Sequence, residues 1–285
     1  MNPNLVSTEW LAARLGDPDV VPVDGSWYLP DAGRDGAAEF RERHIPGAAF
    51  FDINAVADLS SGLPHMLPSP EVFADAVGRL GIGTGSTVVA YDGAGLFAAA
   101  RVWWTFRVMG VNKVHVLDGG LPKWLAEGRQ AETGASSRQP TSFAAQFDQT
   151  AVKSADQIAE ALRAQSVQVL DARSGPRFRG EAPEPRPGLA SGHIPGSLNL
   201  PFQEVLGADG RLRDEEELRA AFEKAGVDLG RPVVTTCGSG VTAAILALAL
   251  ESVGARAAGL YDGSWAEWGA GGGGRPGARG RAGTG

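Results

Sequence analysis

The sequence predicts an α/β fold made of two tandem domains, each a parallel sheet flanked by helices on both faces. Three sequence landmarks recur in the same order after 144 to 149 residues, which indicates two copies of one domain. Within each copy, short runs of β-branched residues alternate with segments of helical character. Strands that alternate with helices form parallel sheets covered on both faces, so we expect this layered structure in each copy.

The landmarks and the composition between them set the domain limits. The repeated pairs are Arg43-His-Ile-Pro-Gly-Ala48 and Gly192-His-Ile-Pro-Gly-Ser197, Leu117-Asp-Gly-Gly and Tyr261-Asp-Gly-Ser, and Val21-Pro-Val-Asp24 and Val169-Leu-Asp171. A polar stretch with several Ser and Gln residues separates the copies. We therefore expect an N-terminal domain over residues 1–134, a linker over 135–150, a C-terminal domain over 151–270 and a disordered Gly/Arg-rich tail over 271–285.

The first copy begins with a helix over residues 8–15, because Ser7 is a favoured N-cap. A strand follows over 20–23. The next helix is predicted to start after Ser69 as its N-cap, with Pro70 at the first helical position and Glu71 in the first turn. It extends to about residue 81. The remaining elements are a strand over 87–91, a helix over 98–109 and a strand over 114–117.

The second copy opens with Ser154 and Gln157, whose spacing is that of a capping box. Its first strand covers residues 167–170, and a helix capped by Asp214 runs to residue 224. The last predicted unit is a strand over 233–236, a short loop, and a helix rich in Ala and Leu over 243–252.

Composition excludes several classes of partner. The net charge of −7 argues against nucleic acid or an anionic membrane as the main partner. A single cysteine permits no internal disulfide, and we find neither a signal peptide nor an apolar run that could span a membrane, so we expect a cytoplasmic protein. No cluster of His, Cys and Asp has the spacing of a metal site, so we expect no metal and no cofactor.

The only cysteine, Cys237, lies in the loop Cys237-Gly-Ser-Gly-Val-Thr242 between the strand over 233–236 and the following helix. Glycines let such a loop curl and turn its backbone N–H groups toward one point. The positive end of the helix dipole also favours an anion there. A lone cysteine is more often a small buried hydrophobe, but a core cysteine needs no glycines beside it. The pattern therefore favours a thiolate nucleophile.

Together these landmarks and this loop resemble the tandem-domain rhodanese family, which comprises thiosulfate and 3-mercaptopyruvate sulfurtransferases. The resemblance extends over about residues 5–268. It implies that Cys237 takes up sulfur as a persulfide and passes it to an acceptor. Enzymes of the thiosulfate type have the loop Cys-Arg-Lys-Gly-Val-Thr, whereas the neutral loop here is similar to the 3-mercaptopyruvate type.

The same resemblance implies the roles of individual residues. It assigns catalysis to Cys237, Ser239 and His65, and substrate binding to the remaining members of the set, Arg177, Arg186, Gly238, Gly240, Val241 and Thr242. The acidic partner of the family's histidine is replaced here by Asn54, although Asp52 is close in sequence and could take its place. An asparagine cannot carry the charge that stabilises an imidazolium, so the family's relay of protons is in question.

The first copy carries Asp92 where the second carries Cys237. A carboxylate cannot accept a sulfane sulfur, so we expect the first domain to be catalytically silent, to wall the cleft and to supply His65. Arg101 either binds substrate or anchors the domain interface. The histidines of the repeated His-Ile-Pro-Gly landmark, His44 and His193, are expected to tie loops by ring hydrogen bonds.

Several alternatives stand beside this interpretation. A cysteine-dependent phosphatase also cradles an anion in such a loop, but it needs an arginine six residues after the cysteine, where this chain has Ala243. A thiosulfate sulfurtransferase is the second candidate, and a non-catalytic binding module of the same fold is the third. The acceptor of the sulfur is left open between thioredoxin, glutathione, cyanide and a dedicated sulfur-carrier protein.

Overall fold

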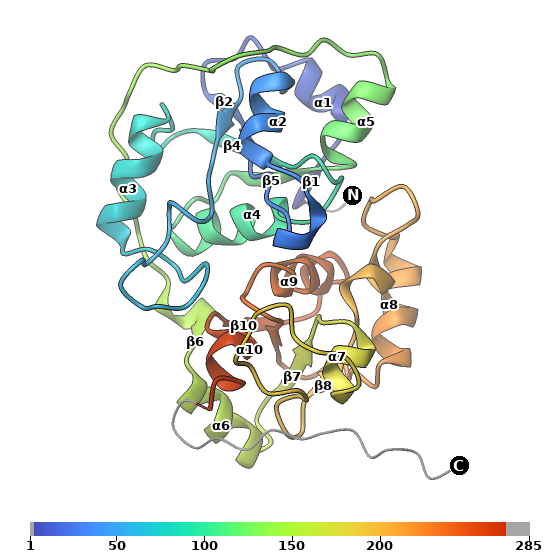
Figure 1. Ribbon diagram of the computed structural model, residues 1–285. Helices are drawn as coiled ribbons and strands as arrows, with labels where there is room; N and C mark the ends of the chain where they lie inside the picture. The colour runs from blue at the N-terminus through green and yellow to red at the C-terminus, as the bar shows by residue number, and fades with distance from the viewer. Residues whose placement is uncertain (1–2, 272–285) are drawn as a thin grey trace. The chain divides into compact units, whose positions relative to one another are not determined.

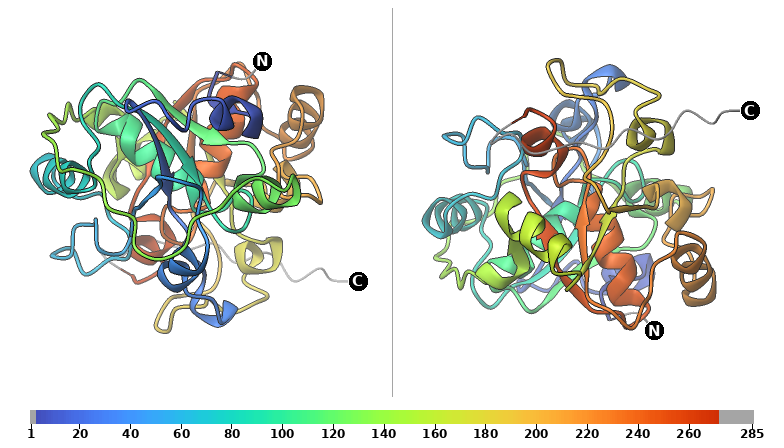
Figure 2. Two further views of the ribbon diagram at one scale, coloured as in Figure 1. Left: turned by 90° about the horizontal axis from the view of Figure 1, so that it is seen from above. Right: turned by 90° about the horizontal axis from the view of Figure 1, so that it is seen from below.

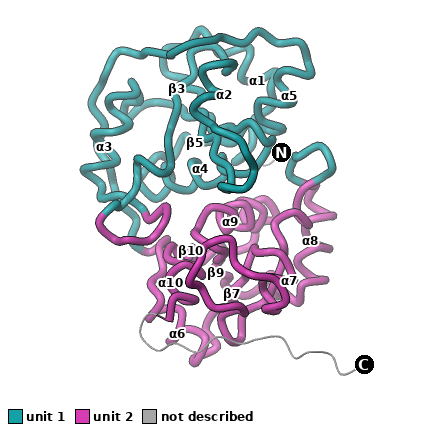
Figure 3. The backbone as a smooth tube through the Cα atoms, viewed as in Figure 1, with its two compact units in different colours: residues 1–59, 67–149, 207–212 teal, residues 60–66, 150–206, 213–285 magenta. Residues whose placement is uncertain are grey.

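A computed structural model describes residues 3–271 in two compact units (Figures 1 and 3). The first unit comprises residues 1–59, 67–149 and 207–212, and the second comprises 60–66, 150–206 and the chain from Arg213 onward. The tail predicted over 271–285 lies outside the described residues except for its first position. The predicted domain limits remain a prediction, because the units are not simple halves of the chain.

The first unit contains a five-stranded parallel sheet with the strand order β1-β5-β4-β2-β3. Its strands are β1 (Leu5–Val6), β2 (Val20–Asp24), β3 (Ala49–Phe50), β4 (Thr87–Tyr91) and β5 (Val114–Leu117). Its helices are α1 (Thr8–Ala12), α2 (Gly36–Glu42), α3 (Pro70–Arg79), α4 (Ala99–Val108) and α5 (Gly120–Ala126). Short 3₁₀ turns occur at Pro30–Ala32 and Gln149–Ala151.

Helices cover both faces of this sheet. On one face, Leu11 of α1, Phe40 of α2 and Trp124 of α5 pack with the buried β4 residues Val89 and Tyr91. A separate aromatic cluster joins α3 and α4, whose rings Phe73 and Phe106 meet edge to face at 5.0 Å between centroids. The strands lie between these helices in the views of Figure 2. The prediction of a doubly covered parallel sheet is confirmed.

The second unit repeats this design with the strand order β6-β10-β9-β7-β8. Its strands are β6 (Val152–Lys153), β7 (Gln168–Asp171), β8 (Leu198–Asn199), β9 (Val233–Thr236) and β10 (Ala257–Tyr261). Its helices are α6 (Ala155–Arg163), α7 (Gly175–Arg179), α8 (Glu215–Lys224), α9 (Ala243–Ser252) and α10 (Ser264–Trp268), with a 3₁₀ turn at Phe202–Val205. The same topology in both units confirms the internal repeat.

Helix starts agree well with the sequence signals. Ser7, Ser69 and Asp214 accept backbone N–H bonds as N-caps, and Ser154 forms the expected capping box with Gln157. The first helix ends at Ala12, whereas the prediction extended it to residue 15. Residues 13–16 form irregular turns instead.

The polar stretch predicted as a linker is held by backbone hydrogen bonds of the first unit. Thr141 N donates to Gly78 O at 2.9 Å, and Gln146 N donates to Met109 O at 3.0 Å. Phe143 also stacks edge to face on Phe73 of α3 at 5.5 Å. Much of this stretch is therefore structured, which its polar composition did not indicate.

Two short segments group with the unit built mainly from the other sequence copy (Figure 3). Residues 60–66 lie between β3 and α3 in sequence but belong to the second unit. Residues 207–212 lie between β8 and α8 but belong to the first unit. Since β3 and β8, and likewise α3 and α8, are equivalent elements of the repeat, the two segments are equivalent as well.

Within residues 3–271, none of the helices combines the length and the apolar character that crossing a membrane requires.

Candidate active site

Cys237 follows directly on β9, at the carboxyl edge of the second sheet, and α9 begins six residues further on at Ala243. The loop turns at Gly240, whose φ of +78° lies in the left-handed region that favours glycine. Cys237 is buried, with 3% of its surface exposed. The predicted strand, glycine turn and helix are therefore present, and Cys237 is buried at the start of the loop; the ring of N–H groups around its sulfur stays a prediction.

The backbone of the loop is fixed by the start of α10. Ser264 Oγ accepts from Cys237 N at 3.2 Å and donates to Tyr261 O at 2.8 Å. The carbonyl of Cys237 accepts from Trp265 N at 3.0 Å. Ser264 is fully buried and has a φ of +49°, which is uncommon for a residue with a side chain. These contacts hold the main chain on both sides of the sulfur.

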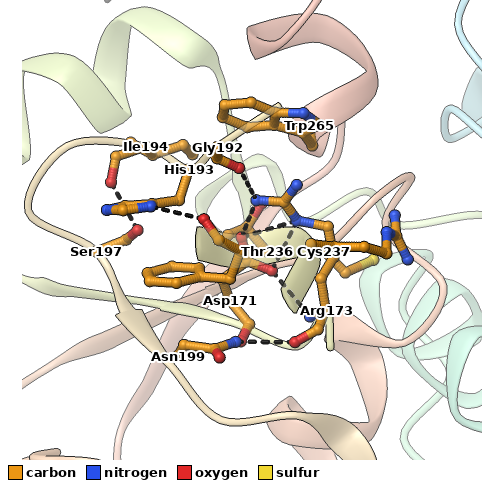
Figure 4. Close-up of polar contacts among 12 residues, drawn as sticks. Asp171, Arg173, Gly192, His193, Ile194, Ser197, Asn199, Thr236, Cys237 and Trp265 are labelled. Atoms are coloured by element: carbon orange, nitrogen blue, oxygen red, sulfur yellow. Dashed lines mark hydrogen bonds and ion pairs between the residues drawn. The ribbon is translucent and has the colours of Figure 1, made fainter. Parts of the chain in front are cut away.

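A buried ion network lies beside the loop (Figure 4). Arg173 pairs with Asp171 at 2.7 Å and with Glu184 at 2.8 Å, and all three side chains are at most 2% exposed. Arg173 also donates to Gly192 O at 3.0 Å and stacks over the Trp265 ring at 4.4 Å. Burial alone would lower the pKa of Arg173, but its two carboxylate partners outweigh burial and raise the pKa.

Glu184 extends this network toward the cysteine by pairing with Arg177 of α7. A Cβ placed on Gly238 would lie 3.2 Å from Arg177 Nη2 and 3.9 Å from Arg186 Nη1. Two guanidinium groups thus converge on the residue that follows Cys237. A side chain at position 238 would therefore have to displace the end of Arg177 by a few tenths of an ångström.

Arg186 differs from Arg177 in its anchoring partner. Its Nη2 lies 3.3 Å from His65 Nε2, in the segment 60–66 of the second unit. Burial lowers the pKa of Arg186, the negative charge of Cys237 raises it in part, and the like charge of Arg177 lowers it further. An arginine remains protonated at any working pH, so Arg186 presents a full positive charge near the sulfur.

The structure brings most of the predicted site residues together in the second unit. Ser239 is 5% and Val241 2% exposed within the loop, and Thr242 is the N-cap residue of α9. Asp52 and Asn54 belong to the first unit, where Asp52 Oδ1 accepts from Asn54 N at 2.8 Å and so closes a turn. Their predicted relation to His65 stays a prediction, and so do the catalytic roles.

Three residues that position the site were not identified from the sequence, namely Arg173, Glu184 and Ser264. For Glu184 and Arg173, their sequence positions next to residues already singled out could have indicated a role. Glu184 is two residues before Arg186, and Arg173 is two residues after the aspartate that ends β7. Ser264 gave no sequence signal of its own beyond its place in the repeated landmark.

The landmark histidines are structural, as predicted. His44 Nδ1 lies 2.7 Å from Phe40 O, and His193 Nδ1 lies 2.7 Å from Phe178 O. Each ring also stacks on the phenylalanine whose carbonyl it contacts. Arg101 is buried in α4 of the first unit with its guanidinium over the Trp104 ring at 4.7 Å, and neither of its predicted roles is thereby decided.

Known proteins resemble this chain over nearly its whole length. The rhodanese-like domain family matches it twice, over residues 7–127 and 154–270. The 3-mercaptopyruvate sulfurtransferase of Homo sapiens is 47% identical over 270 residues, which cover 93% of this chain and 91% of that protein. The thiosulfate sulfurtransferase of Cricetulus griseus is 45% identical over 271 residues, with the same coverage.

Among solved structures, the 3-mercaptopyruvate sulfotransferase SseA of Escherichia coli matches with a TM-score of 0.85 at 40% sequence identity. The match covers 92% of this chain and 98% of SseA. The human and hamster relatives are named for different sulfur donors, yet their identities to this chain are nearly equal. Overall identity to these relatives therefore does not distinguish the two donors.

Proposed function

The chain belongs to the rhodanese-like family and transfers sulfur from 3-mercaptopyruvate, and we propose that Cys237 carries this sulfur as a persulfide between donor and acceptor. In the proposed first step, the Cys237 thiolate attacks the sulfur of 3-mercaptopyruvate. A sulfur–sulfur bond forms as the carbon–sulfur bond breaks. The electron pair of the broken bond remains on the leaving enolate, which takes up the thiol proton of the donor through solvent and becomes pyruvate.

The second step regenerates the enzyme. A thiolate or cyanide attacks the outer sulfur of the persulfide, and Cys237 leaves as a thiolate. The acceptors we propose are a thiol, such as that of thioredoxin or glutathione, and cyanide. We also propose that the protein works in the cytoplasm, where an unpaired cysteine stays reduced.

The observation that carries this proposal is the convergence of Arg177 and Arg186 beside Gly238. A guanidinium binds a carboxylate through parallel hydrogen bonds, so this pair can hold the carboxylate and ketone of the donor with its sulfur toward Cys237. We propose that the backbone N–H groups of the loop, from Gly238 to Thr242, stabilise the persulfide anion, as an oxyanion hole does. Ser239 completes the set of polar groups that we assign to the site.

The charge of the site favours 3-mercaptopyruvate over thiosulfate. Arg173 and Arg177 share the carboxylates of Asp171 and Glu184, whereas Arg186 makes no ion pair with a carboxylate of residues 3–271. One positive charge matches the single carboxylate of 3-mercaptopyruvate better than the dianion thiosulfate. The neutral Gly-Ser-Gly stretch of the loop adds no further cation. Thiosulfate sulfurtransferase activity is accordingly the weaker candidate.

Intact-mass measurement tests the proposal directly. The purified protein is incubated without acceptor, once with 3-mercaptopyruvate and once with thiosulfate. We expect a gain of one sulfur, ~32 Da, with 3-mercaptopyruvate and little gain with thiosulfate. The Cys237→Ala variant is expected to gain nothing, which would assign the sulfur to this residue.

Either of two other results would contradict the proposal. A gain with thiosulfate alone would reverse the choice of donor. The absence of any gain would leave the fold as a binding scaffold without this chemistry.

A further inference from the structure

We propose that His65 is a positioning residue that works as a neutral hydrogen-bond acceptor, aiming the Arg186 guanidinium at the donor, and does not transfer a proton in the reaction. This inference rests on the proposed function, because it assigns a role within the same sulfur-transfer site. It changes the expectation from the sequence, which placed His65 in a proton relay.

The hydrogen-bond chemistry of the pair decides the protonation of the ring. A guanidinium has only N–H donors, so the contact of 3.3 Å between Arg186 Nη2 and His65 Nε2 requires a lone pair on Nε2. The ring proton must then be on Nδ1, and the imidazole is neutral. A protonated imidazolium would instead direct an N–H group and a positive charge at the positive charge of Arg186.

The burial of this contact strengthens the argument. His65 is 7% exposed, and the guanidinium group of Arg177 lies near that of Arg186 beside Gly238. Arg177 repels the charge of Arg186 and lowers its pKa, whereas the charges of Cys237 and Glu184 raise that pKa. A second cation on His65 would add to this repulsion in a place where water screens it poorly. The surroundings therefore favour the neutral ring.

The two arginines are anchored in different ways, and the difference has a function. Arg177 is held by the carboxylate of Glu184, which compensates its charge. Among the described residues, the polar side-chain contact of Arg186 is to the ring of His65, which fixes its direction without compensating its charge. An acidic residue in the place of His65 would neutralise the cation that the donor's carboxylate needs. A neutral acceptor supplies orientation and leaves the charge available.

The backbone of the segment also indicates a fixed position. His65 has a φ of +61°, and this left-handed conformation costs free energy for a residue with a side chain. Leu63 N and Leu63 O both lie within hydrogen-bond distance of Ser61 Oγ, at 3.2 and 3.4 Å. The segment thus holds the ring at one place against Arg186.

A double-mutant cycle tests the inference with 3-mercaptopyruvate as donor and cyanide as acceptor. We expect His65→Ala to raise KM about tenfold with kcat within about threefold of the wild type. His65→Gln keeps an acceptor oxygen and is expected to restore KM to within about threefold. In the Arg186→Ala background, His65→Ala should have almost no further effect, because its role is exerted through that arginine.

The pH dependence gives an independent readout. If His65 stays neutral, the profile of kcat between pH 6 and 9 should have the same shape in the wild type and in His65→Gln. His115→Gln, a change in β5 of the first unit, is the matched control for loss of one histidine. The ¹⁵N spectrum of the wild-type protein, assigned with His65→Gln, should show a proton on Nδ1 and none on Nε2 at pH 7.

The contrary outcome is equally well defined. A hundredfold fall in kcat in His65→Ala, persisting in the Arg186→Ala background, would show proton transfer and overturn the inference. A ring protonated on both nitrogens at pH 7 would also overturn it. These results are separate from failure of the proposed function, in which the wild type itself would gain no sulfur from 3-mercaptopyruvate. Thermal unfolding of each variant shows whether it is folded, and the wild-type spectrum needs no variant to be active.

Discussion

The loops that follow β4 and β9 each connect a strand of the parallel sheet to a helix, but their first residues differ in chemistry. In the first unit the residue after the strand is Asp92, whose carboxylate accepts N–H bonds from Ala94, Phe97 and Ala99 at 2.7 to 2.9 Å. In the second unit the corresponding residue is Cys237. The first loop therefore carries its own anion, which shows that backbone N–H groups of this loop type converge on a negative charge at that position.

The groups that cover the two loops differ in charge. A Cβ on Gly93 would meet Tyr28 Oη at 2.5 Å and Arg34 Nη2 at 3.3 Å. Arg34 is paired with Glu39, so this cover carries no net charge. Gly238 instead faces Arg177, which is paired with Glu184, and Arg186, whose polar side-chain contact is to His65. We infer that binding of an external anion needs a loop that has no carboxylate of its own and an arginine that is not paired with a carboxylate. Of the two loops compared, the one that follows β9 meets both conditions.

The strongest prediction exchanges the two key residues. In the double variant Asp92→Cys/Cys237→Ser, we expect sulfur transfer to fall by ~10⁴-fold, equivalent to about 5 kcal/mol in the transition state. The new thiol would lie in a loop without the arginine pair. Turnover with 3-mercaptopyruvate and the intact mass after loading measure the effect, with Cys237→Ser alone as the baseline. Sulfur gain by the double variant above that baseline would show that the loop alone suffices.

A second prediction compares the carboxylates that neutralise each cluster. Glu184→Ala removes a buried carboxylate that the buried Arg173 and the partly buried Arg177 share, and we expect a loss of about 3 kcal/mol in the free energy of unfolding. Glu39→Ala removes a partly exposed pair and should cost less than about 1 kcal/mol. Urea unfolding and hydrogen exchange of β9 and β4 amides measure the two effects. Equal losses would contradict the proposed difference in burial.

The third prediction concerns Asp24 and Asp171, which end the equivalent strands β2 and β7. Asp171 is paired with Arg173, whereas Asp24 has Ser26 at the corresponding position, and burial raises the pKa of Asp24 to about 6 from 3.8. Its contacts with Ser26 lower the pKa only in part, and the nearby charge of Asp92 raises it further. Tyr91 is also beside this carboxyl, and burial together with the charge of Asp24 raises the pKa of Tyr91.

Because the folded state holds the pKa of Asp24 above its unfolded value, ionisation of this group opposes folding. The cost is fully present above pH 6, amounts to roughly 3 kcal/mol, and disappears as the pH falls toward 4. We expect Asp24→Asn to stabilise the first unit at pH 8 and to flatten this part of its pH dependence. Hydrogen exchange of β2 and β4 amides at pH 5 and pH 8 measures it. A less stable variant at pH 8 would show that the charge is compensated after all.

The smallest effect is expected from a single methyl group. Gly238→Ala would place Cβ 3.2 Å from Arg177 Nη2, and we expect KM for 3-mercaptopyruvate to rise about tenfold, or ~1.4 kcal/mol. Neither Gly238 nor Gly93 has a positive φ, so alanine causes no backbone strain at either position. Gly93→Ala is the matched control, because it displaces Tyr28 and should leave KM the same. A KM that also stays the same in Gly238→Ala would remove Arg177 from substrate binding.

What the sequence could predict follows from how local each feature is. The unit of β9, the loop and α9 was predicted correctly, because strand, glycine turn and helix are neighbours in the chain. The strands β1, β3, β6 and β8 have two residues each and were not predicted. Two residues carry no periodicity, and such strands exist only because the neighbouring strand offers hydrogen bonds.

The site shows the same limit. The loop motif pointed to Cys237, and the family resemblance implied Arg177 and Arg186. The ion pairs of Glu184 with Arg173 and Arg177 depend on the fold, so the sequence does not reveal them. The contact of His65 joins residues 121 positions apart, so its neutral acceptor geometry could come only from the fold. The sequence thus named the proposed site residues, and the structure was needed to show which contacts hold them.

The segments 60–66 and 207–212 have a consequence for dividing the chain. Each sequence copy lends a piece of backbone to the unit formed by the other copy. A fragment cut at the linker, from residue 150 onward, would therefore lack the segment that bears His65. We expect such a fragment to be an incomplete second unit, although the sequence copy that it contains is whole.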